Sequence, residues 1–191
     1  MDLDKDTIEE MGKIYYPIIK AILENDKEFF RFTSQIKIRF NYDESSMGVL
    51  ATCSRTEDVI QVNLCEFMNY YQSKDFYNIE YYLLHEIRHI FQHLIIRDYK
   101  DKKSVPISAE TVEKWIYEQE HYIRAIDKNG KENSGYFNQD SEFDAYLFSY
   151  AVMKYKYGDL PDLYVPSCYG REFNEGVDKW IDAFKKEGLS K

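Results

Sequence analysis

The segment from Asn78 to Asp98 constrains the fold of this chain most strongly. Its apolar residues recur about every 3.6 positions and form one broad face, which predicts a long amphipathic helix. The same segment contains LLHEIRHIFQHL, in which three of the four histidines of the chain lie at intervals of four residues. Either this helix carries a metal site, or its histidines are satisfied by ordinary hydrogen bonds.

The pattern His-Glu-x-x-His makes His85 and His89 the predicted pair of metal ligands. Side chains four residues apart lie on one face of a helix, about 6 Å from each other, so both imidazoles can reach one ion. Glu86 is turned by about 100° around the helix, beside the metal position, where it can act as a general base. His93 lies about 12 Å beyond His85, which excludes it from that ion and predicts a polar contact at the side of the helix. His121, in the next predicted helix, is a further candidate ligand.

Glu142 is the candidate for the third ligand. It lies at the start of a predicted helix, Ser141 to Tyr157, at the edge of a mostly apolar surface where a carboxylate needs a partner. Two histidines from one helix and a carboxylate from a second, antiparallel helix leave a fourth tetrahedral position open for water, as in catalytic zinc sites. The alternative is a solvated glutamate stabilised by the dipole at the start of its helix.

The remaining sequence predicts an α+β fold that is mainly helical, with a small three-stranded sheet before the helix that carries the motif. The chain of 191 residues, 44% of them hydrophobic, is long enough for one core and short for two, so residues 1–191 are predicted to form a single domain. Alternating apolar and polar residues predict strands at Ile36–Tyr42, Met47–Ser54 and Asp58–Leu64. Helical periodicity predicts further helices at Thr7–Glu24, with a bend or restart near Pro17, at Ala109–Asp127 and at Glu172–Lys186, and Lys131–Gln139 reads as a polar loop.

Composition excludes several classes of protein. The net charge of -9 leaves too few lysines and arginines for an extended phosphate-binding surface, so nucleic acid is not an expected partner. No stretch approaches 18 continuous apolar residues and the acidic start of the chain does not resemble a signal peptide, so we expect no membrane partner and a cytoplasmic location. The three cysteines form no CxxC pair, which argues against a disulfide framework or a cysteine zinc site.

Two stretches of the sequence together resemble a known group of enzymes. They are His85-Glu86-Ile87-Arg88-His89 and Glu142-Phe143-Asp144-Ala145, with Phe148 and Ala151 behind the second. Between about Ile36 and Tyr157 the chain is similar to the gluzincin metallopeptidases, especially the small ones of the ImmA/IrrE-like kind. The resemblance implies that His85, His89 and Glu142 bind Zn2+ and that Glu86 is catalytic. It also implies a minimal zincin-like fold, with Asp58–Leu64 in the place of the edge strand that pairs with an extended peptide.

Two positions depart from the pattern of that group. Arg88, inside the motif, is bulkier and more polar than expected there, and we expect its side chain to face solvent. Tyr146 stands where related patterns often carry an aspartate that orients a histidine ligand, and Asp144 is the available replacement.

The predicted function is therefore a zinc-dependent peptidase that acts on a peptide or protein substrate, with Glu86 as general base. The alternative is a catalytically inactive zinc-binding domain with a regulatory or protein-interaction role. A third interpretation, a helical interaction protein without metal, rests only on the 18 tyrosines of the chain.

Overall fold

A computed structural model describes residues 3–30, 36–46, 48–54, 57–125, 131, 133–160 and 162–189. These residues form an α+β fold that is mainly helical, with one small sheet, as the sequence predicts. The elements in chain order are α1 (Lys5–Asp26), β1 (Lys37–Asn41), a 3-10 turn (Glu44–Ser46), β2 (Ala51–Cys53), β3 (Val59–Asn63), α2 (Leu64–Gln72), α3 (Phe76–Lys100), α4 (Ala109–Glu120), α5 (Ser134–Phe137), α6 (Asp140–Tyr157) and α7 (Arg171–Glu187).

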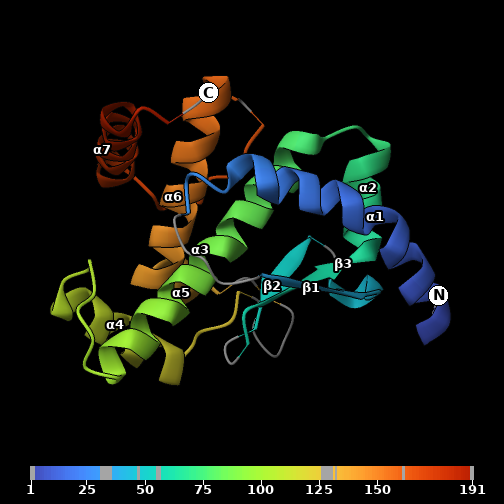
Figure 1. Ribbon diagram of the computed structural model, residues 1–191, viewed down its shortest axis with the longest axis horizontal. Helices are drawn as coiled ribbons and strands as arrows, with labels where there is room; N and C mark the ends of the chain where they lie inside the picture. Colours follow the sequence, from blue (N-terminus) through green and yellow to red (C-terminus); the bar gives the residue numbers. More distant parts are fainter. Residues whose placement is uncertain are drawn as a thin grey trace.

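Helix α3 runs through the middle of the molecule, with the sheet and α1 on one side and α6 with α7 on the other (Figure 1). Its apolar residues serve two cores. Ile79, Leu83 and Ile87 are buried against α1, α2 and the sheet, whereas Tyr81 and Leu84 are buried against α6 and α7. The histidine motif lies on the part of α3 that faces the first turn of α6.

Helices α3 and α6 pack antiparallel. Three pairs of polar residues show the direction, since the position on α6 rises as the position on α3 falls: Gln92 with Ser141, Arg88 with Asp144, and Glu80 with Lys156. The predicted helices Asn78–Asp98 and Ser141–Tyr157 are thus confirmed within a few residues at each end. Their antiparallel contact brings the first turn of α6 beside the histidines of α3.

The sheet has the strand order β1-β3-β2, with β1 parallel to β3 and β2 antiparallel to it. A strand lies within each of the three predicted segments, but β2 covers only Ala51–Cys53 of the predicted Met47–Ser54, of which Met47 lies outside the described residues. The prediction that Asp58–Leu64 supplies an edge strand is wrong, because β3 pairs on both sides and is the central strand. The edge strand next to α3 is β2, which follows the turn at Glu44–Ser46.

Helix α1 continues through Pro17 without the predicted restart, with Ile19 and Leu23 buried on the far side of that residue. The sequence did not predict α2, which is capped by Asn63 through a hydrogen bond from the Cys65 backbone N–H. Because Asn63 closes β3 and caps α2 at once, the strand pattern continues into a helix without a loop.

Helix α4 is shorter than predicted, since it ends at Glu120 instead of Asp127, and residues 126–130 lie outside the described part of the chain. The helix ends because the backbone of Ile123 is bound by a side chain: the buried Gln139 amide accepts from its N–H and donates to its carbonyl oxygen, both at 3.0 Å. The predicted loop at Lys131–Gln139 contains the short helix α5, with Glu132 outside the described residues. Among the helices described, none has both the length and the apolar character needed to cross a bilayer.

Candidate metal centre

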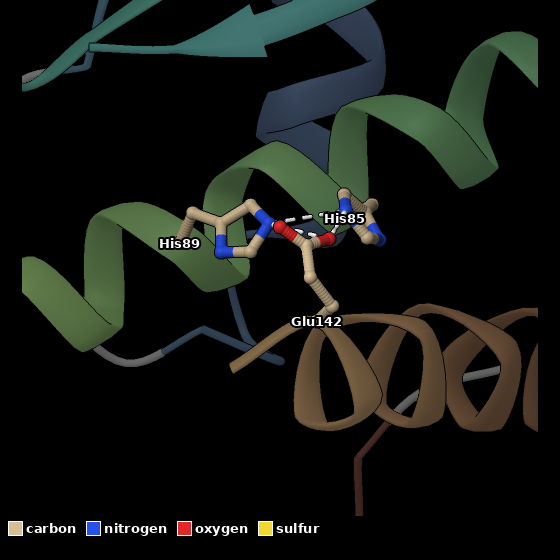
Figure 2. A group of neighbouring side chains, drawn as sticks. All are labelled: His85, His89 and Glu142. Carbon is tan, nitrogen blue, oxygen red and sulfur yellow. Dashed lines mark hydrogen bonds and ion pairs between the residues drawn. The ribbon is translucent and has the colours of Figure 1, made fainter. Parts of the chain in front are cut away.

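His85, His89 and Glu142 converge in the space between α3 and the first turn of α6 (Figure 2). The two histidine Nε2 atoms lie 3.1 Å apart. Oε2 of Glu142 lies 3.3 Å from Nε2 of His85 and 3.5 Å from Nε2 of His89. The structure therefore brings together the three residues that the sequence proposed as ligands, and it does so with one atom of each directed at a common point.

These distances fit a tetrahedral metal ion. Ligand atoms at about 2.0–2.2 Å from a tetrahedral zinc ion are separated from each other by about 3.3 Å, and the three observed separations are 3.1, 3.3 and 3.5 Å. Oε2 of Glu142 is also buried, and although both histidine Nε2 atoms lie within ion-pair distance of it, it forms no hydrogen bond with a described residue. The residues present could thus hold a metal ion, with two imidazoles and one carboxylate as ligands.

Glu142 is held in place from two directions. At the start of α6, the Glu118 carboxylate of α4 accepts hydrogen bonds from the backbone N–H groups of Asp140, at 2.5 Å, and Ser141, at 2.9 Å. The Tyr122 hydroxyl donates to Oε1 of Glu142 at 3.1 Å. Tyr122 occupies one carboxylate oxygen and leaves the other facing the histidines. No sequence pattern distinguishes Tyr122 from the other 17 tyrosines, so this contact could not be predicted before the fold was known.

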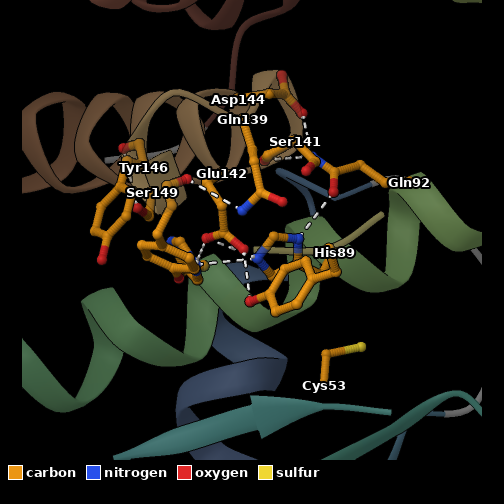
Figure 3. Close-up of polar contacts among 12 residues, drawn as sticks. Cys53, His89, Gln92, Gln139, Ser141, Glu142, Asp144, Tyr146 and Ser149 are labelled. Carbon is orange, nitrogen blue, oxygen red and sulfur yellow. Dashed lines mark hydrogen bonds and ion pairs between the residues drawn. The ribbon is translucent and has the colours of Figure 1, made fainter. Parts of the chain in front are cut away.

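Gln92 orients His89, and the sequence did not identify it (Figure 3). Its Nε2 donates to the carbonyl oxygen of Ser141 at 2.9 Å and to Oδ2 of Asp144 at 2.8 Å. Both of these groups can only accept, so the amide oxygen of Gln92 must be the atom that lies 2.8 Å from Nδ1 of His89. Nδ1 of His89 is therefore the protonated nitrogen, which directs Nε2 toward His85 and Glu142 for metal binding.

Arg88 is buried, so the expectation that it faces solvent is wrong. Its guanidinium donates two hydrogen bonds to Asp144, at 2.8 and 3.0 Å, and lies over the Phe91 ring at 4.3 Å from the ring centre. The bidentate ion pair and the ring compensate for the loss of water. Asp144 contacts no histidine directly; it accepts a hydrogen bond from Gln92, which in turn contacts His89.

His85 has no comparable partner. Its Nδ1 is buried without a hydrogen bond to any described residue, and its ring packs against the Tyr146 ring, with 4.4 Å between the ring centres. One of the two histidines is thus held by a hydrogen-bond network and the other by packing.

Burial and mutual charge perturb the ionisable groups of this centre. Burial lowers the pKa of His85, and the charge of His89 lowers it further, against the effect of Glu142. Burial also lowers the pKa of His89, but the neighbouring Glu142 carboxylate outweighs it and raises that pKa to about 9. Burial raises the pKa of Glu142, yet the two histidines hold it below its usual range. Without metal, the centre is an ion pair between a protonated His89 and an ionised Glu142, so a metal ion would displace a proton.

Glu86 lies beside this centre on the wall of a pocket of about 600 Å³. Burial raises the pKa of its carboxyl group to about 8, with a further contribution from Glu142. His89 and Glu142 also line the pocket, together with residues 51–53 of β2 and residues of α4 and the segment that follows it. Glu86 therefore shares the pocket with the ligand residues without being one of the three converging groups.

The other two histidines lie outside the centre. Nδ1 of His93 lies 3.7 Å from Sγ of Cys53 in β2, which is the polar contact at the side of the helix that the sequence predicted. His121 is exposed, stacks on the Tyr117 ring at 4.2 Å between ring centres, and does not join the His85, His89 and Glu142 group.

Comparisons of the chain with known protein families, with curated proteins and with solved structures find no significant match.

Proposed function

We propose that the protein is a zinc-dependent peptidase with a minimal zincin-like fold. The observation that supports this most strongly is the spacing of Nε2 of His85, Nε2 of His89 and Oε2 of Glu142, which matches three corners of a tetrahedral zinc site. Two histidines and a glutamate, with a fourth position left for water, form a ligand set of catalytic zinc; structural zinc sites use four protein ligands. The alternative, a zinc-binding domain without activity, would have the same ligands but no use for Glu86 in the pocket.

The residues around the centre have separate roles in this proposal. His85, His89 and Glu142 hold the ion, and Gln92 and Tyr122 orient two of these ligands. Zinc in this position would polarise the scissile carbonyl and lower the pKa of water. Glu86 accepts a proton from the attacking water as the water oxygen bonds to the carbonyl carbon, and it passes this proton to the leaving nitrogen as the C–N bond breaks.

The pocket supports an extended peptide as the substrate. Ala51, Thr52 and Cys53 of β2 line it, and in the described sheet β2 pairs with β3 along one side only. A strand with one unpaired side can form main-chain hydrogen bonds with an extended peptide, which would run past Glu86. In the proposed complex β2, and not the predicted segment Asp58–Leu64, is the edge strand that pairs with the peptide.

Replacement of Glu86 by glutamine tests the proposal. Zinc content, measured by elemental analysis, should stay near one ion per chain, while cleavage of a randomised hexapeptide pool, followed by mass spectrometry, should fall by at least about 100-fold, the effect of losing a general base. Glu175→Gln, at an exposed position on α7, is the matched control and should cleave like the original chain. Zinc binding without cleavage by the original chain would favour the inactive domain, and a protein purified without chelators that holds no metal would refute both.

A further inference from the structure

The pocket has one end rich in hydrogen-bond donors. This end, which we call the α4 end, is formed by Trp115 and Gln119 of α4 and by Tyr122, Arg124 and Ala125 of the segment after it. Among the described residues that line the pocket, Arg124 is the sole lysine or arginine. The acids of the lining are Glu86 and Glu142, beside the candidate metal centre. The described lining of the pocket therefore contains one cationic side chain and two carboxylates.

Arg124 is placed at this end by its neighbours in the chain. The residue before it, Ile123, is bound through both its backbone N–H and its carbonyl oxygen to the buried Gln139 side chain. Two residues before it, Tyr122 bonds to Glu142. The Arg124 side chain is exposed and forms no ion pair with a described carboxylate. Its backbone is thus fixed close to the metal centre, and its guanidinium remains available to a ligand.

Trp115 adds a second donor at the same end. Its indole Nε1–H is buried and has no hydrogen-bond acceptor among the described residues. Buried donors in folded proteins nearly always have an acceptor, so this group calls for one. Indole and guanidinium N–H groups can only donate, which means that a ligand suited to both must carry acceptor atoms.

We propose that the α4 end of the pocket binds a carboxylate of the substrate, with Arg124 as its ion partner. The inference rests on the proposed peptidase function, because it takes the ligand to be a peptide. A guanidinium binds a carboxylate through two parallel hydrogen bonds, whereas the carboxylates of Glu86 and Glu142 would repel the same group. The substrate is therefore held in one direction, with its carboxylate at Arg124 and an uncharged part of its chain at Glu86. The carboxylate comes from an aspartate or glutamate side chain or from the C-terminus of the peptide.

Three pools of randomised hexapeptides test this proposal. The first pool is amidated and contains no aspartate or glutamate, the second is amidated with glutamate allowed at every position, and the third lacks acidic residues but has a free C-terminus. Zinc-loaded Glu86→Gln protein is incubated with each pool, and retained peptides are measured by ultrafiltration and mass spectrometry. We expect the second or third pool to be retained about tenfold more than the first, the gain from a charge-assisted hydrogen-bond pair. The second pool identifies a side-chain carboxylate and the third a terminal one.

The same measurement with Arg124→Gln in the Glu86→Gln background should abolish the preference. Arg124→Lys should retain part of it through its charge, and Arg171→Gln, at an exposed position of α7, should leave it unchanged. Equal retention of the three pools, or a preference that survives Arg124→Gln, would overturn the proposal even if the protein cleaves peptides. Conversely, selective retention without cleavage by the original chain would refute the peptidase and leave the carboxylate site intact.

Discussion

Replacement of Gln92 by leucine should weaken zinc binding although Gln92 is not a ligand. The change removes three contacts of the amide: 2.8 Å to Nδ1 of His89, 2.9 Å to the Ser141 carbonyl oxygen and 2.8 Å to Asp144. Nδ1–H of His89 then has no acceptor, and the imidazole is free to rotate or to change tautomer. Leucine fills a similar volume, and the bidentate contact from Arg88 still satisfies Asp144, so we expect the helix packing to survive.

The expected loss of zinc affinity follows from the role of Gln92 in orienting His89. Loss of a group that orients a histidine ligand typically costs 10- to 100-fold in metal affinity, which corresponds to about 1.4–2.7 kcal/mol. Competition for zinc with a chromophoric chelator measures this directly, and urea denaturation of the metal-free protein shows whether the fold is intact. Gln72→Leu, at an exposed position near the end of α2, is the matched control. A zinc affinity within about twofold of the original, in a folded Gln92→Leu protein, would refute the role of Gln92 in orienting His89.

Two further predictions concern stability. Burial raises the pKa of Asp26, which pairs with Lys156, to about 6, and the Glu80 carboxylate adds to the effect. In the unfolded chain the carboxyl pKa is about 3.9, so the folded protein binds this proton more tightly. The protein therefore loses up to about 3 kcal/mol of stability from this group as the pH rises from 4 to about 6. Asp26→Asn should remove that loss, so urea denaturation should show the variant gaining on the original between pH 4 and 7, and parallel pH profiles would contradict it. A Cβ at Gly12 in α1 would lie 2.5 Å from Cδ2 of Phe40, so Gly12→Ala should cost about 1 kcal/mol net despite the better helix propensity of alanine. Thermal denaturation measures this, and a stabilised variant would show that the Phe40 ring moves aside without cost.

The parts of the structure that the sequence predicted are those fixed by local patterns. The period of the apolar residues defines α3 and α6, and the spacing of His85 and His89 on one helical face follows from helix geometry alone. Glu142 could be proposed because an acid at the edge of an apolar helix surface needs a partner, and the structure supplies that partner at 3.3 and 3.5 Å. The zinc and the peptidase activity remain proposals.

The parts that the sequence did not predict depend on contacts between distant segments. The strand order places β3 in the centre because β1 and β2 both pair with it, and alternation within Asp58–Leu64 is the same for a central and an edge strand. Helix α4 ends early because Gln139, 16 residues after Ile123, takes the backbone groups that a further turn would use. Gln92 gains its role only because Asp144 and Ser141 lie opposite it, 52 and 49 residues away in the sequence.

Arg88 shows how a residue in a local sequence motif depends on contacts between distant segments. Arg88 directly precedes the second histidine of the motif, and the sequence predicts that its side chain faces solvent. In the structure Arg88 binds Asp144, Asp144 binds Gln92, and Gln92 binds His89. The contacts that fix α6 against α3 are therefore the same contacts that orient His89. An ion held by His85 and His89 of α3 and by Glu142 of α6 would add one more link between these two helices, so metal binding and the packing of α3 on α6 should stabilise each other.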